Sequence, residues 1–569
     1  MLNFAAVHFS AYGWGVGVVG CGGMSLNLAD VWEAVAKVVP EADALVCGTV
    51  KRTWREFEDR SARLAAVLGN LGIGAGDNVG LYLYNGNAYS EATFGAFKAR
   101  AAPCNVNYRY TAGELRYLLQ DADAKVLFFS AELASQVEQA RADLPLLRAC
   151  ICVGEPTNPT NPTDEVPDWA LDYEALISRS APAPPIGRSP DDLWILYTGG
   201  TTGHPKGVMW PHSSLMGTME PTFGALRLPT PRNLLEVQAN VQTICDTNRV
   251  TRQLAASPLM HGTASIISLA TFAQGGALIT MPQRSFDADA VWRCVQQHRA
   301  TVLTIVGDAF AKPMAEALDA AAAQNKPYDI SSVFMIMSSG VIWSQPVKEA
   351  LLAHKNMKLV DTLGSSEGTG TAIKVSDREN RSATGRFQLG RHSAVFDEND
   401  QPVEPGSGTQ GLLAVGGPIP VGYYNDPEKT KATFRIISGQ RWSIPGDWAT
   451  VEADGTITLL GRGSACINSA GEKIYPEEVE EALKAHQSVA DCLVVGIPDP
   501  KWGEAVTAVV ELSGEATDAE ILAMARSRLA SYKLPKSIVR TPAVQRGANG
   551  KPNYVWAKQV ATEALGISN

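Results

Sequence analysis

A run of glycine and threonine residues around one lysine constrains this chain more than any other feature. Residues 197–207 read Tyr-Thr-Gly-Gly-Thr-Thr-Gly-His-Pro-Lys-Gly and follow an apolar segment at 193–196 that predicts a buried strand. Glycines let the backbone turn tightly and bring its N–H groups against an anion, while threonine hydroxyls add donors and Lys206 adds a positive charge. A loop that is only mobile needs neither a lysine nor three hydroxyls. The segment therefore predicts a polyphosphate-binding loop.

The spacing of this loop differs from that of the common P-loop, in which four residues separate the first glycine from a Gly-Lys-Ser/Thr triplet. Here Lys206 follows Pro205 and precedes Gly207. The segment instead resembles the phosphate loop of the adenylate-forming superfamily, whose pattern is Tyr-Thr-Ser-Gly-Thr-Thr-Gly-x-Pro-Lys-Gly. Gly199 stands where that pattern has serine, so one hydroxyl donor is lost. The resemblance assigns nucleotide binding to Thr198, Gly199, Gly200, Thr201, Thr202, Gly203 and Lys206.

Composition narrows the class of protein further. The chain has 569 residues, of which 45% are hydrophobic and 19% charged, so more than one well-packed domain and no long disordered tract are expected. A net charge of −10 argues against broad binding of nucleic acid or of an anionic membrane. The nine cysteines include no Cys-x-x-Cys pair, which favours reduced thiols in the cytoplasm over disulfides or a zinc site.

The first residues have an unusual composition. Residues 1–23 are rich in glycine, alanine, valine and aromatic residues and contain no lysine or arginine. A signal peptide needs a basic start, and a membrane span would carry fewer glycines. From Met24 the pattern changes and leads into an amphipathic helix. We therefore expect translation to start at Met24 and residues 1–23 to be a start-site extension, which the intact mass of the natural protein tests.

Strand and helix patterns alternate along the first part of the chain. Segments 79–84 and 126–129 predict buried strands, and two helical patterns lie between them. The second of these opens with a capping box formed by Thr111 and Glu114. Alternating strands and helices imply parallel sheets and an α/β fold.

Other stretches mark loops and a boundary. Proline-rich segments at 155–169 and 181–190 predict loops, whereas 221–252 has weak periodicity and receives no element. A boundary falls near 461–464, because about 110 residues after it form a plausible small domain. A helix in that domain begins at Pro476, a favoured first helical position.

A second motif, Asp361-Thr-Leu-Gly-Ser-Ser-Glu367, resembles the family's Tyr-Gly-x-Thr-Glu. The resemblance assigns Glu367 to Mg²⁺ and Ser366 to the surroundings of the α-phosphate, with Leu363 in place of the aromatic residue that stacks on adenine. A helix N-cap is the alternative interpretation of Gly-Ser-Ser-Glu. The nucleotide-binding set then includes Ser339, Gly340, Leu363, Gly364, Ser365 and Ser366, the first two from a small-residue turn expected at the adenine pocket.

Two further motifs carry the ribose and acyl sites by resemblance. Asp447 ends Trp-Ser-Ile-Pro-Gly-Asp, and its acceptor-only carboxylate suits two ribose hydroxyls, with Arg462 as its partner. Pro445 replaces the threonine of the family. His261 in Pro-Leu-Met-His-Gly matches a position that lines the acyl pocket. We do not expect it to act as a general base, because a carboxylate nucleophile is already ionised. Segment 221–252 precedes it and is expected to form a wall of that pocket.

The C-terminal motifs resemble the moving parts of the family. The stretch from Gly461 contains Ser464 at the hinge position and Gly471 in the loop that reaches the thioester-forming site. Lys551 ends Arg-Gly-Ala-Asn-Gly-Lys and would bridge the carboxylate and the α-phosphate. Thr198, His261, Glu367 and Lys551 are thus the predicted catalytic residues.

The resemblance covers the chain from Met24 onward and implies an ATP-dependent acyl-CoA ligase, within a branch acting on steroid side-chain acids and long-chain fatty acids. It implies an adenylate-forming domain at 24–461, with parallel sheets, helices and a small β-barrel-like subdomain, and a mobile α+β domain at 462–569. ATP, Mg²⁺, coenzyme A and a carboxylic acid are the expected ligands. Nucleic acid and a membrane segment are not expected, and a homodimer is one possible assembly.

Several alternatives stay open at this stage. One is an aryl or medium-chain acid:CoA ligase. Another is a nucleotide-binding regulatory relative that no longer catalyses, to which the departures at Gly199, Leu363 and Pro445 point. A peptide-synthetase module is disfavoured because no carrier domain follows Lys558. A kinase would release ADP rather than AMP and pyrophosphate.

Overall fold

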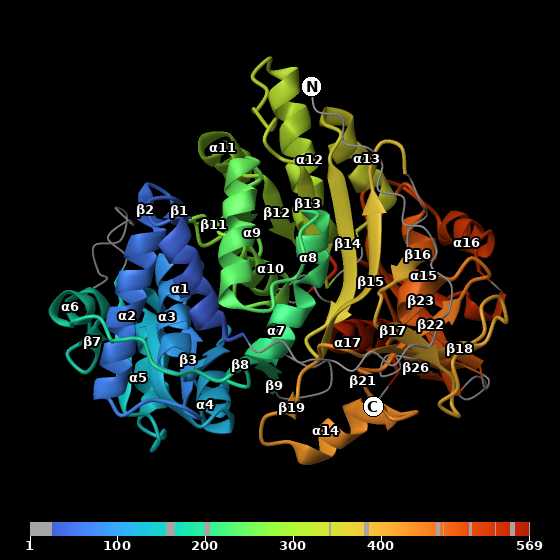
Figure 1. The fold of residues 1–569 in the computed structure, drawn as a ribbon. Helices are drawn as coiled ribbons and strands as arrows, with labels where there is room; N and C mark the ends of the chain where they lie inside the picture. Colours follow the sequence, from blue (N-terminus) through green and yellow to red (C-terminus); the bar gives the residue numbers. More distant parts are fainter. Residues whose placement is uncertain are drawn as a thin grey trace.

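Two large sheets with helices on their faces make up the main body of the protein, and a third sheet forms a separate lobe (Figure 1). The computed structural model describes residues 26–154, 166–198, 205–340, 343–380, 386–462, 467–469, 472–499, 503–529, 531–546 and 552–567.

The first sheet has eight strands and a parallel centre. β3 pairs in parallel with β4 and β5, and their alternation with helices confirms the expected α/β pattern. The order across the sheet is β19 (Gly422–Tyr423), β9 (Lys206–Pro211), β8 (Leu193–Thr198), β4 (Ala102–Asn105), β3 (Asn78–Tyr82), β5 (Ala124–Ser130), β6 (Ala149–Val153) and β7 (Leu171–Asp172).

The second sheet changes from mostly parallel to antiparallel pairing along its width. One half pairs mostly in parallel, in the order β2 (Val50–Thr53), β1 (Asp43–Cys47), β11 (Ala277–Thr280), β10 (Arg252–Ala255), β12 (Val302–Ile305), β13 (Met335–Ser339), β14 (Lys358–Ser365). The other half is antiparallel and matches the expected barrel-like subdomain: β15 (Gly368–Ser376), β16 (Arg386–Leu389), β23 (Thr456–Arg462), β22 (Asp447–Val451), β18 (Gln410–Val415), β21 (Gln440–Ser443), β20 (Phe434–Ile437), with β17 (Ser393–Phe396) paired to β18.

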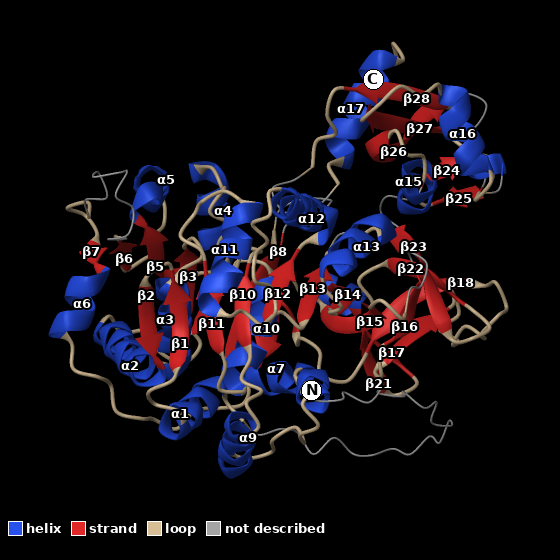
Figure 2. Ribbon diagram, turned by 90° about the horizontal axis from the view of Figure 1, so that it is seen from above, coloured by secondary structure: helices blue, strands red, loops and turns tan. Residues whose placement is uncertain are grey.

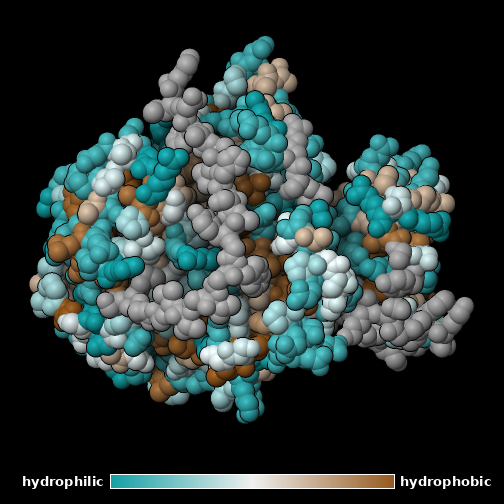
Figure 3. Space-filling model, turned by 45° about the vertical axis from the view of Figure 1, so that its right-hand side comes forward, coloured by the Kyte–Doolittle hydropathy of each residue, from teal (hydrophilic) through white to brown (hydrophobic). Residues whose placement is uncertain are grey.

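The C-terminal lobe has its own sheet and its own core. Its strands are β25 (Glu472–Ile474), β24 (Ile467–Ser469), β27 (Gly503–Leu512), β26 (Val489–Asp499) and β28 (Ser537–Thr541), and its helices are α15 (Pro476–Lys484), α16 (Asp518–Arg526) and α17 (Tyr554–Ala564). It projects from the main body in Figures 2 and 3. α15 begins at Pro476, as the sequence predicts.

The remaining helices cover the two large sheets. They are α1 (Leu28–Val38), α2 (Trp54–Asn70), α3 (Asn87–Lys98), α4 (Ala112–Asp121), α5 (Ala134–Arg141), α6 (Tyr173–Arg179), α7 (His212–Thr218), α8 (Glu220–Ala225), α9 (Leu234–Asp246), α10 (Gly262–Ala273), α11 (Ala288–His298), α12 (Gly307–Ala323), α13 (Gln345–His354) and α14 (Pro427–Thr433). The capping box predicted at Thr111 and Glu114 opens α4. Segment 221–252, unassigned from its weak periodicity, contains most of α8 and all of α9. α8 has six residues and prolines nearby, so it gives little periodic signal, whereas α9 has 13 residues and packs on α1.

An aromatic cluster holds α10 against the N-terminal helices. The Trp32 ring meets the rings of Phe94 and Phe272 edge to face, each with centroids 5.0 Å apart. Phe57 packs against the same two phenylalanines. Such pairs add about 0.5–1.5 kcal/mol each beyond the area they bury. Because Phe272 lies on α10, this cluster fixes the helix whose opposite face lines the cavity described below.

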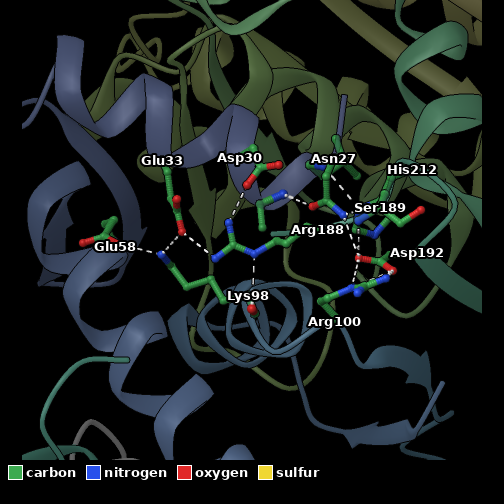
Figure 4. Close-up of polar contacts among 12 residues, drawn as sticks. Asn27, Asp30, Glu33, Glu58, Lys98, Arg100, Arg188, Ser189, Asp192 and His212 are labelled. Carbon is green, nitrogen blue, oxygen red and sulfur yellow. Dashed lines mark hydrogen bonds and ion pairs between the residues drawn. The ribbon is translucent and has the colours of Figure 1, made fainter. Parts of the chain in front are cut away.

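A buried charge network joins α1 to the strand that leads into the phosphate loop (Figure 4). The Lys98 ammonium lies 2.6 Å from carboxylate oxygens of both Glu33 and Glu58. Arg188 reaches the same Glu33 at 2.9 Å. Burial alone would raise the pKa of Glu33, but the Lys98 and Arg188 charges outweigh it and hold that pKa below its ordinary value.

The same network extends to both strands that flank the loop. Asp192, directly before β8, accepts from Arg100 at 2.8 Å and from Asn27, the N-cap of α1, at 3.0 Å. His212, directly after β9, accepts from the Leu28 amide through Nδ1 at 3.2 Å. α1 therefore anchors both ends of the β8–β9 hairpin.

His212 should make the stability of the protein depend on pH. Burial of the ring lowers its pKa from 6.5 to about 3. The unfolded chain therefore takes up a proton near pH 6.5, and the folded chain does so only near pH 3. Relative to a His212→Asn variant, the wild type should lose about 1.4 kcal/mol of unfolding free energy per pH unit below 6.5. Denaturant unfolding at pH 6 and pH 5 measures this difference. If the unfolding free energies of the two proteins changed equally between these pH values, this prediction would be contradicted. The matched control is His486→Asn, a histidine substitution in the C-terminal lobe.

Candidate active site

The β8–β9 hairpin presents the predicted phosphate loop at its tip. Thr198, the last residue of β8, pairs with Lys206, the first of β9. The loop residues between them, 199–204, lie outside the described residues, and they include Gly199, Gly200, Thr201, Thr202 and Gly203. The two ends of the loop are thus held by a regular antiparallel pair.

Local packing explains the residues around the loop. A Cβ on Gly207 would lie 2.7 Å from the Tyr197 ring, so only glycine fits opposite this tyrosine. The Tyr197 hydroxyl donates to Asp121 at 2.8 Å. Burial and this carboxylate raise the pKa of Tyr197 well above its usual range, so the hydroxyl remains a donor.

Lys206 has a carboxylate beside it in this structure. Its ammonium lies 3.3 Å from Asp426, the N-cap residue of α14. Burial would lower the pKa of Lys206, but the hydrogen bond to Asp426 and nearby negative charges raise it, so the side chain stays cationic. Asp426 therefore orients the lysine charge next to the loop.

Glu367 lies in the turn between β14 and β15. Its Oε1 accepts from the Tyr423 hydroxyl at 2.6 Å, and its amide donates to Ser365 Oγ at 3.2 Å. The Trp210 indole donates to the Ser366 carbonyl at 3.0 Å, which ties this turn to β9. The segment is a strand–turn–strand, so the helix N-cap interpretation of Gly-Ser-Ser-Glu is wrong.

The small-residue turn after β13 lies beside the same motif. Ser339 ends β13 and pairs with Thr362 of β14, while Gly340 follows with φ +88°, a conformation that favours glycine. Thr362 donates to the Ser338 carbonyl at 3.1 Å. Leu363 packs on the core of the barrel-like subdomain.

The two predicted ribose residues meet across one ladder. Asp447 begins β22 and stands directly opposite Arg462, which ends β23. Gly446, with φ +103°, makes the turn that leads into β22. The described contacts of Arg462 are those of its backbone.

His261 is the N-cap residue of α10, and the buried side-chain amide of Asn105 ties this helix start to the β8–β9 hairpin. The Asn105 side chain accepts from the Tyr197 amide at 2.6 Å and donates to the Tyr197 carbonyl at 2.8 Å. Its Nδ2 also donates to the carbonyl of Met260, directly before His261, at 2.7 Å. Asn105 therefore fixes the distance between the two motifs.

One continuous cavity is lined by the described members of the predicted site other than Arg462. Its lining includes Thr198, Lys206, His261, Ser339, Gly340, Leu363, Gly364, Ser365, Ser366, Glu367 and Asp447. Ser464, Gly471 and Lys551 lie outside the described residues. Segment 221–252 contributes Pro221, Thr222, Leu226 and Arg249 to the same lining, where the sequence places a pocket wall.

Three contributors were missed in the sequence. Asn105, Tyr423 and Asp426 position Tyr197, Glu367 and Lys206 respectively. Asp426 precedes Pro427 at a helix start, a capping signal that the sequence does carry. Asn105 and Tyr423 act over long sequence separations, and no local pattern marks such contacts.

The residues present fit a magnesium ion shared with a nucleotide. Mg²⁺ prefers oxygen ligands and is commonly held by one or two carboxylates together with substrate phosphates. The Glu367 carboxylate lines the cavity. The turn that carries Glu367 is bonded to β9 through the Trp210 indole, which brings it next to the β8–β9 hairpin. No group of three or more His, Cys, Asp or Glu side chains suited to a metal occurs within the described residues.

Comparison with known proteins identifies the family. Residues 32–424 match the model of the AMP-binding enzyme family, and residues 478–551 match its AMP-binding enzyme C-terminal domain. The 3-oxocholest-4-en-26-oate–CoA ligase of Rhodococcus rhodochrous is 39% identical over 541 residues, which cover 94% of this chain and 96% of the relative. Medium-chain acyl-CoA ligase Mig of Mycobacterium avium is 40% identical and covers 93% and 97%. The chain belongs to the AMP-binding enzyme family.

Solved structures agree with the fold. The anthranilate CoA ligase AuaEII in complex with anthranoyl-AMP superposes with a TM-score of 0.80 at 20% identity, over 96% of this chain and 99% of that one. A Mycobacterium tuberculosis fatty acyl CoA synthetase gives 0.69 at 24% identity, over 95% and 99%.

These findings confirm the resemblance, the fold class and the enzyme class predicted from the sequence. The protein is an acid–thiol ligase, with ATP and CoA as co-substrates. Among the described residues, no helix is long and apolar enough to cross a membrane.

The hydrogen bond from Tyr423 to Glu367 gives a first test of the site. A hydrogen bond to a charged group contributes about 1.5–3 kcal/mol. Tyr423→Phe should therefore lower kcat/KM for MgATP by roughly 10-fold or more. The neighbouring Tyr424 donates instead to Asp123 at 3.0 Å, so Tyr424→Phe is the matched control. Equal effects of the two substitutions would show that the Glu367 contact has no special part.

Proposed function

We propose that the protein activates a long-chain fatty acid or a steroid side-chain acid as its acyl-adenylate and then transfers the acyl group to CoA. One observation carries this proposal: the described motif residues surround a single cavity that also runs along α10. Nucleotide and acid can therefore meet between Thr198 and His261. Relatives named for 3-oxocholest-4-en-26-oate and for medium and long-chain fatty acids support the choice of acid.

In the first step a carboxylate oxygen attacks the α-phosphorus of ATP, and pyrophosphate leaves. Thr198, the loop at 199–204 and Lys206 hold the phosphates, with Asp426 orienting the lysine. Asp447 and Arg462 hold the ribose, and Ser339, Gly340 and residues 363–366 surround the base and the α-phosphate. Mg²⁺ on Glu367 would neutralise the charge of the leaving group. Fixed charges aimed at the reacting phosphorus stabilise the transition state.

In the second step the CoA sulfur attacks the acyl carbonyl carbon, and AMP leaves. We infer that the C-terminal domain, residues 462–569, turns about a hinge at Ser464 between the two steps. Gly471 then leaves room for the pantetheine arm, and Lys551 withdraws from the α-phosphate. The separate core and sheet of the C-terminal lobe support such a rigid movement.

A medium-chain or aryl acid is the second candidate for the substrate. Medium-chain acyl-CoA ligase Mig supports the first, and a feruloyl-CoA synthase of Amycolatopsis, 32% identical over 91% of this chain and 95% of its own length, supports the second. The long cavity-lining face of α10 argues against an aryl acid, because a single aromatic ring would cover only part of it.

Compartment and assembly are part of the proposal. We place the protein in the cytoplasm, which is supported by nine scattered cysteines without a Cys-x-x-Cys pair. A homodimer is the assembly that light scattering would test.

The reaction is tested by AMP and pyrophosphate release across a panel of short, long-chain, aryl and steroid side-chain acids, each with and without CoA. CoA-dependent release should be fastest with long-chain or steroid side-chain acids, since these fill the groove along α10. Release of pyrophosphate that ignores CoA would point to another acceptor. No release with any acid would favour a regulatory nucleotide-binding protein.

Lys551 should matter in only one half-reaction. Lys551→Ala removes the charge that bridges carboxylate and α-phosphate, so adenylation should fall by roughly 100-fold or more. Thioester formation from preformed acyl-adenylate should be nearly unchanged. Lys558→Ala, a change at a half-exposed lysine on α17, controls for charge in the same lobe. Equal loss in both half-reactions would refute the assignment.

A further inference from the structure

The cavity face of α10 is one continuous stripe. The lining side chains Thr263, Ile266, Ile267, Ala270, Thr271 and Gln274 recur every three or four residues, the spacing of a single helix face. His261 is the N-cap of this helix and Gln274 its C-cap. A helix of this length extends for about 18 Å. The stripe therefore leads from the proposed site of adenylation to a distant end.

The stripe is apolar in the middle and polar at its far end. Gln274 is only 4% exposed, yet it lines the cavity. Its Nε2 donates to Thr222 Oγ1 on α8 at 2.9 Å, and the Thr222 hydroxyl donates in turn to the Met219 carbonyl at 2.7 Å. The Gln274 amide is thus fixed in place from α8.

This anchoring uses only part of the amide. A glutamine side chain offers two N–H donors and a carbonyl acceptor, and buried polar groups are normally paired. Within the described residues, the bond to Thr222 engages one N–H. The nearby Thr271 hydroxyl donates to the Gln253 side-chain oxygen at 2.9 Å, so it does not occupy the Gln274 amide. The rest of the Gln274 amide is therefore available to a ligand in the cavity. A second N–H and the carbonyl oxygen therefore suit a neutral carbonyl or hydroxyl of a ligand.

The wall around this end is built from α8 and the segment before β10. Arg249 donates to the Leu226 carbonyl at 2.8 Å and so ties residues 247–251 to the end of α8. Both segments line the cavity beside Gln274. An acid with a plain alkyl end would desolvate the amide without replacing its hydrogen bonds, which costs about 1–3 kcal/mol.

We propose that Gln274 hydrogen-bonds a carbonyl or hydroxyl oxygen at the end of the acid remote from its carboxylate, and thereby selects acids oxygenated at that end over plain alkyl acids. This inference rests on the proposed ligase function. It makes Gln274 a specificity residue far from the reacting atoms. It also explains why a stripe that is apolar in its middle ends in a buried amide.

The test compares two acids on three proteins. The acids are 3-oxocholest-4-en-26-oate, which carries a ketone far from its carboxylate, and hexadecanoate, which does not. The proteins are the wild type, Gln274→Met, which keeps the side-chain length, and Ser268→Ala. Ser268 donates to the Ala264 carbonyl at 2.8 Å within the helix and is absent from the cavity lining, so it is the matched control.

The quantity to measure is the ratio of kcat/KM for the two acids. Gln274→Met should lower this ratio by roughly 10-fold, whereas Ser268→Ala should leave it unchanged. A purely structural role of Gln274 would lower kcat/KM for both acids equally, and an unchanged ratio overturns the proposal. Turnover of neither acid by the wild type would instead refute the ligase function with these substrates.

A binding measurement keeps the test independent of turnover. Hydrogen bonding keeps the ultraviolet absorption of the conjugated ketone of the steroid acid at longer wavelength than an apolar environment does. The acid bound to Gln274→Met should therefore absorb at shorter wavelength than the acid bound to the wild type or to Ser268→Ala. The same absorption wavelength with all three proteins contradicts the proposal.

Discussion

The buried amide of Asn105 is the contact on which the rest of the site depends. It exchanges two hydrogen bonds with the backbone of Tyr197 and donates a further one to Met260. The phosphate hairpin and the start of α10 belong to chain segments far apart in sequence, and this amide is 4% exposed between them. A buried amide with all partners in place is rigid, because any movement would leave polar groups unpaired. It therefore sets the distance between the β8–β9 hairpin and the start of α10.

Two sets of contacts hold the segments that Asn105 joins in place, one on the side of the β8–β9 hairpin and one on the side of α10. The charge network around Lys98, Arg188 and Asp192 fixes α1 against the base of the β8–β9 hairpin. The aromatic cluster around Trp32 and Phe272 fixes the back of α10. The cavity-lining face of α10 thus lies opposite the face that this cluster packs against.

Motifs near in sequence could be predicted, and contacts between distant segments could not. The apolar run before Thr198, the capping box of α4 and the start of α15 each follow from a local pattern, and the structure has all three. Alternation of strands and helices gave the parallel sheets. The pairing of Tyr423 with Glu367 and the role of Asn105 depend on strands that become neighbours only after folding. Segment 221–252 was unassigned because α8 is short, and because α9 packs on α1, a segment far away in the sequence.

We propose that nucleotide and acid share one cavity, with the acyl group lying along α10. The most direct measurement is a crystal structure with a non-hydrolysable analogue of the acyl-adenylate of 3-oxocholest-4-en-26-oate. We expect the phosphate beside Thr198 and Lys206, the ribose at Asp447, and the steroid along the stripe that ends at Gln274. An acyl group directed away from α10, or a nucleotide bound outside this cavity, would contradict it.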